Sequence, residues 1–238
     1  SAAAVVMDVH NGDVLVLSSV PGFDPNRFVT GLSYRSWREL LNDPSTPLIN
    51  KAISGLYAPG STFKMAVALA ALEAGIVDQD HKVFCSGHTL LGNTKFHCWE
   101  KHGHGWQDML DAHQNSCDVY FYDIATRVGV DRIAAMANKL GLGLKTGIDL
   151  PAEKNGTIPT RAWKKAALGS SWQLGETLIT GIGQGFVLTT PLQLAVMTSR
   201  LANGGFAVRP RLIRPQFDDG RSADPKFKPV GISDQALD

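Results

Sequence analysis

The feature that most constrains this chain is the tetrapeptide Ser61-Thr62-Phe63-Lys64. Pro59 and Gly60 precede it, and the Ala- and Leu-rich run 65–73 follows it, so the sequence predicts a helix over residues 61–74 that begins at the serine. Ser61 and Lys64 then lie one turn apart on nearly the same face. A serine hydroxyl becomes a useful nucleophile only beside a base, and a lysine removed from water can serve as that base. The helix N-terminus also favours negative charge developing on an attacked carbonyl.

Alone, this motif is weak evidence for catalysis. A Ser-x-x-Lys pattern is expected about once by chance in a chain of this length, because serine and lysine are both common residues. The alternative interpretation is a serine-capped helix with a solvated lysine. The rest of the sequence decides between them.

Composition excludes several classes of protein. The chain has 238 residues and a formal net charge of +1, and it lacks the basic patches that would indicate a nucleic-acid partner. Its apolar runs are shorter than the ~20 residues of a membrane span. Features of a signal peptide are absent from the first residues. If the protein is anchored in a membrane, we expect the anchor to lie outside this chain.

Local signals predict an α+β fold. Asn11-Gly12 lies between two Val-rich runs and predicts a hairpin over residues 3–19. One hairpin is too small to form a stable sheet, so we expect strands after residue 238 to complete it. Further helices are predicted over 34–41, over 116–140 with a break near Gly129, and over 191–202 with Thr190 as its cap. Residues 82–106 show little periodicity and are expected to be irregular.

A second motif supports the catalytic interpretation. Ser116-Cys117-Asp118 follows Ser61 along the chain, as a Ser-Asp-Asn motif follows Ser-x-x-Lys in penicillin-binding proteins and class A β-lactamases. With this motif the chain resembles the class B penicillin-binding proteins, and most closely their elongation-type penicillin-binding protein 2 group. The resemblance extends over most of the chain, through the blocks 4–15, 57–64, 116–122, 146–151, 181–185 and 190–195.

The resemblance implies a site and an activity. It makes Ser61 the acylated nucleophile, Lys64 the general base and Ser116 a proton relay opposite Lys64. Asp118 stands where many relatives have asparagine, and elongation-type members often carry aspartate there. Ser116 and Asp118 also suit a helix N-cap, and both roles can hold together. The implied fold is the transpeptidase fold shared with serine β-lactamases, an antiparallel sheet with a helical subdomain, and residues 1–238 would form one fragment of that domain.

The implied protein is a D,D-transpeptidase that cross-links peptidoglycan stem peptides ending in D-Ala-D-Ala during cell elongation. It would react covalently with β-lactam antibiotics and need no organic cofactor. The resemblance places it in the periplasm on an inner-membrane anchor, with a SEDS-family glycosyltransferase and other elongation-complex proteins as partners.

Two glycine-containing segments invite a different interpretation. Lys145-Thr146-Gly147 looks like the family's third motif, a Lys-Thr-Gly strand, but it leads into the family's Thr-Gly-Ile-Asp-Leu-Pro block, which is a loop remote from catalysis. We expect the true third motif after residue 238, which would leave this fragment poorly active or inactive. The segment 181–185 lacks the context of a phosphate loop and is predicted to be a backbone bend before the helix at 191–202.

Cysteines and histidines gather in one window. All three cysteines and five of the seven histidines lie within residues 85–117. An odd number of cysteines cannot be fully paired, and the residues alone leave open a zinc site, free thiols, or one disulfide with a free thiol. Some elongation-type relatives hold a structural metal here, and the resemblance carries its ligands onto Cys85, Cys98, His104 and Cys117. The nearby aromatic residues Phe96, Trp99 and Trp106 are expected in the core rather than in a substrate platform.

Three other functions share parts of this pattern. A serine β-lactamase or esterase would use the same acylation and then hydrolyse the acyl-enzyme quickly. A penicillin-recognising sensor or scaffold would bind without turnover, and slow turnover of a D-Ala-D-Ala peptide by the intact protein would favour it. A zinc hydrolase would need an open metal position, and three thiolates favour a closed structural site instead.

Overall fold

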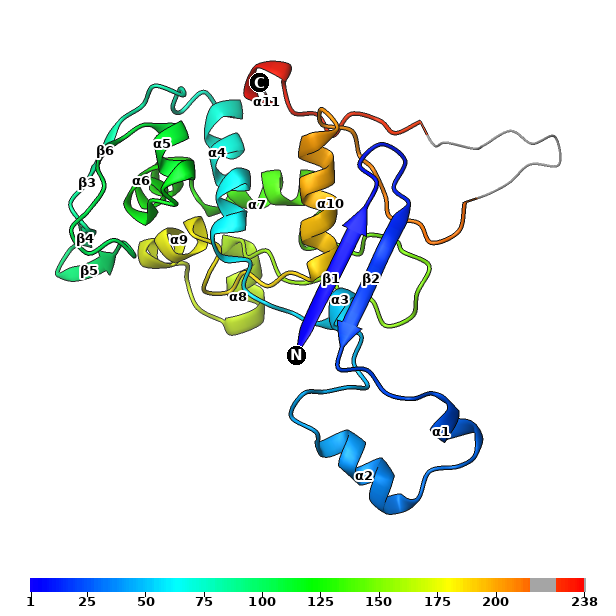
Figure 1. The fold of residues 1–238 in the computed structure, drawn as a ribbon. Helices are drawn as coiled ribbons and strands as arrows, with labels where there is room; N and C mark the ends of the chain where they lie inside the picture. The colour runs from blue at the N-terminus through cyan, green and yellow to red at the C-terminus, as the bar shows by residue number, and fades with distance from the viewer. Residues whose placement is uncertain (215–225, 238) are drawn as a thin grey trace.

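The computed structural model describes residues 1–214 and 226–237. Figure 1 shows three regions side by side: a two-stranded hairpin, a central group of helices, and a region of four short strands. Strands β1 (Ala2–Met7) and β2 (Val14–Val20) form the hairpin. None of the helices in the described ranges is long and apolar enough to cross a membrane.

The predicted hairpin is confirmed, with its turn at the predicted place. Strands β1 and β2 are antiparallel, with Val5 opposite Leu17. Gly12 has a φ of +83°, a conformation that favours glycine. The carboxylate of Asp8 accepts hydrogen bonds from the backbone N–H groups of His10 and Asn11 at 2.8 and 3.1 Å. These bonds close the turn locally, and so the sequence predicts it well.

The central helices bury the main core. Helix α4 (Lys64–Glu73) packs against α6 (Asp118–Val128) and α7 (Val130–Lys139), and α9 (Leu174–Gly181) packs on α6. Helix α10 (Pro191–Ala202) packs on β1 and connects this core to the hairpin (Figure 1). Helix α4 is apolar on nearly all sides, as expected of a helix buried among others. It is therefore a rigid base for the residues at its N-terminal end.

Helix ends with local signals lie where the sequence predicts. Thr190 caps α10 in a capping box with Gln193, and Pro191 is its first residue. Gly129, with a φ of +82°, separates α6 from α7. Gly75, with a φ of +60°, follows the end of α4. The helix predicted over 34–41 is α2 (Tyr34–Asn42), which Ser33 caps.

The start of the serine helix differs from the prediction. Residues Gly60–Phe63 form a 3₁₀ turn, and α4 itself begins at Lys64. Several short helices were not predicted, because helices of four to eight residues give little periodicity. They are α1 (Asn26–Val29), α3 (Lys51–Ser54), α5 (Met109–Gln114), α8 (Arg161–Leu168), α9 and α11 (Asp234–Leu237).

The prediction of an irregular segment over 82–106 is wrong. Four strands of three or four residues lie there, and they form two small antiparallel sheets, β3 with β6 and β4 with β5. Such strands are too short for alternation to be visible. The dipeptide Gly92-Asn93 between β4 and β5 is a hairpin signal that could have revealed one pair. The strands are β3 (Val83–Cys85), β4 (His88–Leu91), β5 (Thr94–His97) and β6 (Gly105–Gln107).

The segment 181–185 supports the serine turn. It is a bend between α9 and α10, as predicted, and the N–H of Gly60 donates to the carbonyl of Gly183 at 2.9 Å. Gly183 has a φ of +69°, and a Cβ there would lie 2.2 Å from the carbonyl oxygen of Gly60. Only glycine allows this approach. The bend therefore fixes the turn that carries Ser61.

We expect Gly183→Ala to destabilise the chain more than Gly169→Ala. Both glycines have a left-handed backbone, with φ values of +69° and +68°, but nothing lies within 4 Å of a Cβ at Gly169. The control should lose about 1 kcal/mol from backbone strain alone, and the test variant roughly 2–3 kcal/mol more. Denaturant unfolding of both variants measures the difference. Equal losses would show that the Gly60–Gly183 contact is not tight.

Candidate active site

Ser61 and Lys64 lie at the start of the serine helix with opposite exposure. In a 3₁₀ turn, side chains three residues apart eclipse one another, so Ser61 and Lys64 share one face more closely than in an α-helix. Ser61 is exposed, whereas only 1% of Lys64 is accessible to solvent. The turn thus presents a hydroxyl to solvent directly above a buried amine.

Three oxygens surround the amine of Lys64. Its Nζ donates to Oδ1 of Asp118 at 2.7 Å, and to the carbonyl oxygen and Oγ of Ser116 at 2.9 and 3.1 Å. The Phe121 ring lies 5.2 Å from Nζ and contributes a cation–π contact. An ammonium group has three donors and no acceptor, so these oxygens use its full capacity. All three oxygens belong to residues of the second motif, so the amine ties the serine turn to that motif.

Ser116 lies between the lysine and the first serine. Its Oγ donates to Oγ of Ser61 at 2.8 Å while accepting from Lys64. Ser116 has a φ of +50°, which is unfavourable for a residue with a side chain. Glycine would suit this backbone better, but it would supply no hydroxyl. Such strain at a polar residue is typical of functional sites.

Asp118 is held on both carboxylate oxygens. Oδ1 accepts from Lys64, and Oδ2 accepts from the backbone N–H of Trp99 at 3.1 Å. Asp118 is the first residue of α6, where the helix dipole favours a negative charge. The N-cap expectation for Ser116 and Asp118 is wrong, because Cys117 occupies the cap position and makes no side-chain capping bond.

The arrangement can move a proton between two serines and a lysine. The four predicted residues form one continuous chain of hydrogen bonds, from Ser61 through Ser116 to Lys64 and then to Asp118. The Ser116 hydroxyl is hydrogen-bonded to the side chains of both Ser61 and Lys64. A proton leaving Ser61 can therefore reach Lys64 through that hydroxyl.

The predicted metal ligands also come together. Sγ of Cys85, Cys98 and Cys117 and one ring nitrogen of His104 all lie within 4.8 Å of one another. Nδ1 of His104 is 3.6 Å from Sγ of both Cys85 and Cys98. Tetrahedral zinc, with Zn–S of about 2.3 Å and Zn–N of about 2.0 Å, requires an S···N separation of about 3.5 Å, close to the observed distances. The donor set and its spacing fit zinc.

Four different elements bring this cluster together. Cys85 ends β3, Cys98 follows β5, His104 precedes β6 and Cys117 caps α6. All three thiols are buried and unpaired in the structure, so the alternative with a disulfide is not formed there. Burial is the main cause that raises the pKa of the Cys117 thiol, and the neighbouring Cys85 raises it further. Since Cys117 lies between Ser116 and Asp118, the cluster directly adjoins the second motif.

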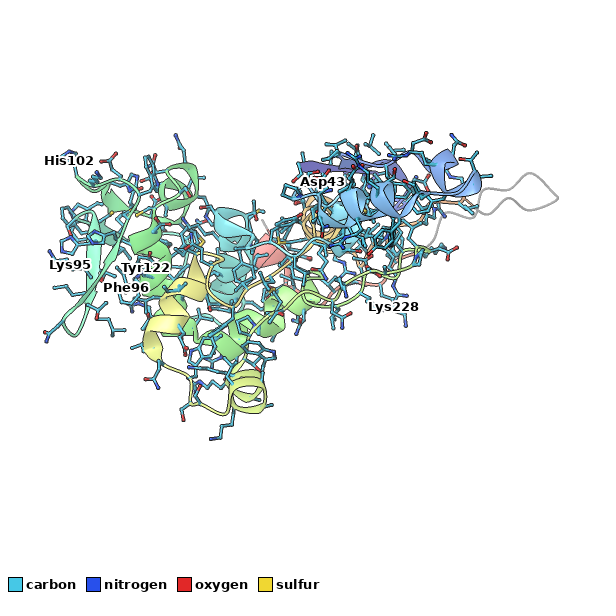
Figure 2. The ribbon with its side chains drawn as sticks, turned by 90° about the horizontal axis from the view of Figure 1, so that it is seen from below. Asp43, Lys95, Phe96, His102, Tyr122 and Lys228 are labelled. Carbon is cyan, nitrogen blue, oxygen red and sulfur yellow. The ribbon has the colours of Figure 1, made fainter. Side chains whose placement is uncertain are left out.

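The expectation that all three aromatic residues lie in the core holds for only one of them. Phe96 is half-buried against Tyr122, with ring centroids 5.9 Å apart, and Figure 2 shows the two side chains near each other. Trp99 and Trp106 are 62% and 66% exposed. Aromatic type alone suggested burial, whereas Trp99 instead donates hydrogen bonds to the second motif. In the sequence, only the position of Trp99 directly after Cys98 indicates that it lies near the second motif.

Lys145-Thr146-Gly147 lies in a loop, as the sequence predicts. Thr146 is buried, and both its N–H and its hydroxyl donate to Oε1 of Glu153 at 2.6 Å. The N–H of Gly147 donates to the other carboxylate oxygen of Glu153 at 3.3 Å. The loop's polar groups are thus occupied with its own closure, and the triplet is not part of a strand.

Proteins of known name and solved structure are similar to this chain in sequence and in fold. Over 97% of this chain, the sequence is 40% identical to the peptidoglycan D,D-transpeptidase MrdA of Escherichia coli strain K12, of which the match covers 37%. The structure matches Pseudomonas aeruginosa PBP2 in complex with WCK 5153 with a TM-score of 0.90 and 42% identity, over 99% of this chain and 52% of that one. It also matches PBP2 in its complex with MreC from Helicobacter pylori, with a TM-score of 0.89 and 35% identity, over 98% of this chain and 43% of that one.

The family assignment rests on nearly the whole chain. The chain spans only about two fifths of the length of the curated relatives it matches. A family model for the penicillin binding protein transpeptidase domain, however, matches residues 2–237. The resemblance inferred from the motifs is therefore confirmed, and this chain belongs to the penicillin-binding protein transpeptidase domain family.

Proposed function

We propose that this chain carries the acylating half of a peptidoglycan D,D-transpeptidase that acts in cell elongation. The hydrogen-bonded series Ser61–Ser116–Lys64–Asp118 is the observation that carries the proposal. The similarity to proteins named peptidoglycan D,D-transpeptidase MrdA supports the choice of reaction. Its substrates would be stem peptides that end in D-Ala-D-Ala, and β-lactams would react at the same serine.

The reaction follows from the positions of these groups. Ser61 Oγ attacks the carbonyl carbon between the two D-Ala residues, and its proton passes through the Ser116 hydroxyl to a neutral Lys64. The bond to the terminal D-Ala then breaks, and the leaving amine takes a proton back along the same route. A second stem peptide's amine attacks the resulting ester, which forms the cross-link and restores Ser61.

We infer that residues after 238 supply the missing third motif. Within the described residues the hairpin sheet has only two strands, and β2 exposes the large apolar residues Leu15, Val16 and Val20. Further strands would cover them. Such a strand would also bring the Lys-Thr-Gly motif, part of the oxyanion hole and the group that binds the substrate carboxylate. Residues 1–238 would then be one fragment of a single transpeptidase domain.

A structural zinc ion completes the proposal. Cys85, Cys98, His104 and Cys117 would hold it, because their spacing fits a closed tetrahedral site. When bound, zinc supplies folding energy rather than chemistry. It would tie three short strands to the N-terminus of α6 and so hold Ser116 and Asp118 near Lys64.

We further propose the setting of the intact protein. Similarity to PBP2 proteins, one of them solved with MreC, supports a periplasmic domain in the elongation complex, on an inner-membrane anchor outside these residues. A related chain belongs to a peptidoglycan synthase complex that coordinates polymerization and crosslinking, which supports a SEDS-family glycosyltransferase as a partner.

We expect Ser61→Ala to abolish covalent labelling of the intact protein by a fluorescent penicillin. The serine is the only member of the series that faces solvent at the helix N-terminus. Gel fluorescence and peptide mass analysis locate the label. Ser36→Ala, on the exposed helix α2, is the matched control and should label normally.

The same assay tests the fragment and the alternative functions. The 238-residue chain by itself should label far more slowly than the intact protein, since loss of one oxyanion-hole donor alone costs roughly 3 kcal/mol. Rapid, stoichiometric labelling of the fragment would reopen Lys145 as the third-motif lysine. A label on another residue, or one that survives Ser61→Ala, would overturn the proposed nucleophile. Rapid release of the label would favour a β-lactamase.

Lys64→Arg should reduce the acylation rate by about a hundredfold or more. Arginine keeps the charge and can still bind Asp118, but it cannot give up a proton at usable pH. Labelling by the fluorescent penicillin, quenched at successive times, gives the rate constant of acylation. Lys164→Arg is the matched control, because Lys164 is also buried and paired with a carboxylate, that of Glu176. Near-normal acylation by Lys64→Arg would exclude Lys64 as the base.

Protein purified without chelator should contain about one zinc ion per chain. Cys117→Ser should lower both metal content and thermal midpoint, and His104→Ala should do the same, because each removes one of four ligands. His88→Ala, on strand β4, is the control and should change neither. Elemental analysis and thermal unfolding measure both quantities. Metal-free protein with three titratable thiols, or with a disulfide, would rule out the site.

A further inference from the structure

Trp99 contacts the second motif through both of its N–H groups. Its backbone N–H donates to Oδ2 of Asp118, and its indole Nε1–H is shared between the carbonyl oxygens of Asn115 and Ser116, each at 3.1 Å. The ring is nevertheless 62% exposed. Burial of apolar surface therefore does not explain why a tryptophan stands there.

Lys64 holds the same two residues from the other side. It binds Oδ1 of Asp118, whereas Trp99 binds Oδ2, and both donate to the carbonyl oxygen of Ser116. The two donors thus clamp one carboxylate and one peptide group between them. Lys64 is expected to change its protonation during the reaction, but the N–H groups of Trp99 keep their protons throughout. Trp99 can therefore donate to Asp118 and Ser116 at every stage of the reaction.

The indole also acts on the strained backbone at Ser116. Asn115 and Ser116 direct their carbonyl oxygens to the same N–H, and the residue between these two groups has a φ of +50°. This conformation is unfavourable and needs support from its surroundings. It aims the Ser116 hydroxyl at Ser61. Loss of the indole N–H should therefore loosen the relay without removing any reacting group.

Trp99 connects this support to the Cys/His cluster. It follows Cys98 directly, and its ring lies edge-on to that of His104, with centroids 5.2 Å apart. From this position beside the cluster, Trp99 donates hydrogen bonds to both Asp118 and Ser116. The cluster thus sets the position of the donor, and the donor sets the position of the relay.

We propose that Trp99 is a positioning residue for acylation, whose indole N–H holds Ser116 between Ser61 and Lys64. The proposal rests on the transpeptidase function proposed above. It predicts an effect on the chemical step rather than on recognition of the β-lactam, because Trp99 acts through Ser116.

The test is Trp99→Phe in the intact protein, which removes the N–H and keeps an aromatic ring. Acylation by a fluorescent penicillin, followed over a range of concentrations, separates the rate constant of the covalent step from the dissociation constant of the preceding complex. We expect the rate constant to fall about tenfold, as for the loss of one hydrogen bond to a strained group. The dissociation constant, metal content and thermal midpoint should stay close to those of the unchanged protein.

Trp172→Phe is the matched control. Its indole also donates a hydrogen bond, to Oγ1 of Thr177 at 2.8 Å, but it binds the connection between α8 and α9 to α9 rather than touching the relay. It should leave the rate constant unchanged. Two results would overturn the proposal: a normal rate constant in Trp99→Phe, or a loss accompanied by matching falls in metal content and thermal midpoint. Persistent labelling of Ser61→Ala, measured in parallel, would instead overturn the proposed function.

Discussion

The buried ammonium of Lys64 is the constraint on which the site depends. A charge at 1% exposure requires oxygen partners, and removal of one partner from such a pair costs about 3–5 kcal/mol. Ser116 and Asp118 supply all three acceptors, more than 50 residues along the chain from Lys64. These contacts therefore tie the N-terminal end of α6 to that of α4. The candidate site and the contact between α4 and α6 therefore share this interaction.

That arrangement holds Ser116 in an unfavourable backbone conformation, and the surroundings explain how it persists. The residue is bound by Lys64 from one side and by Trp99 from the other. Cys117, next along the chain, belongs to the Cys/His cluster. A zinc ion bound there, as proposed, would add its binding energy to the folding of this segment. Strain of order 1–2 kcal/mol is small beside that energy.

The sequence predicts those parts of the fold whose cause is local. Asp8 closes the turn at Asn11-Gly12 through hydrogen bonds to its near neighbours. Thr190 caps a helix together with Gln193, three residues further along the chain. The four candidate catalytic residues and the four cluster residues are predicted from motif and resemblance, and the structure brings each set together. The strands β3–β6 were not found, because each is only three or four residues long and is held by partners distant in sequence. Trp99 was misplaced for a related reason: residue type suggests burial, whereas only tertiary contacts reveal hydrogen bonds to Ser116 and Asp118.

In the proposed mechanism, the two serines reconcile opposite requirements of the nucleophile and the base. Ser61 must face solvent to meet a large substrate, whereas Lys64 serves as a base only if it is removed from water. An exposed group and a buried group cannot share one environment. The Ser116 hydroxyl connects the two, at 2.8 Å from Oγ of Ser61 and 3.1 Å from Nζ of Lys64. The nucleophile is held by the Gly60–Gly183 contact, and the relay by the clamp of Lys64 and Trp99. Within the described residues, the two supports come from separate segments, so the accuracy of acylation depends on how they meet at one hydrogen bond.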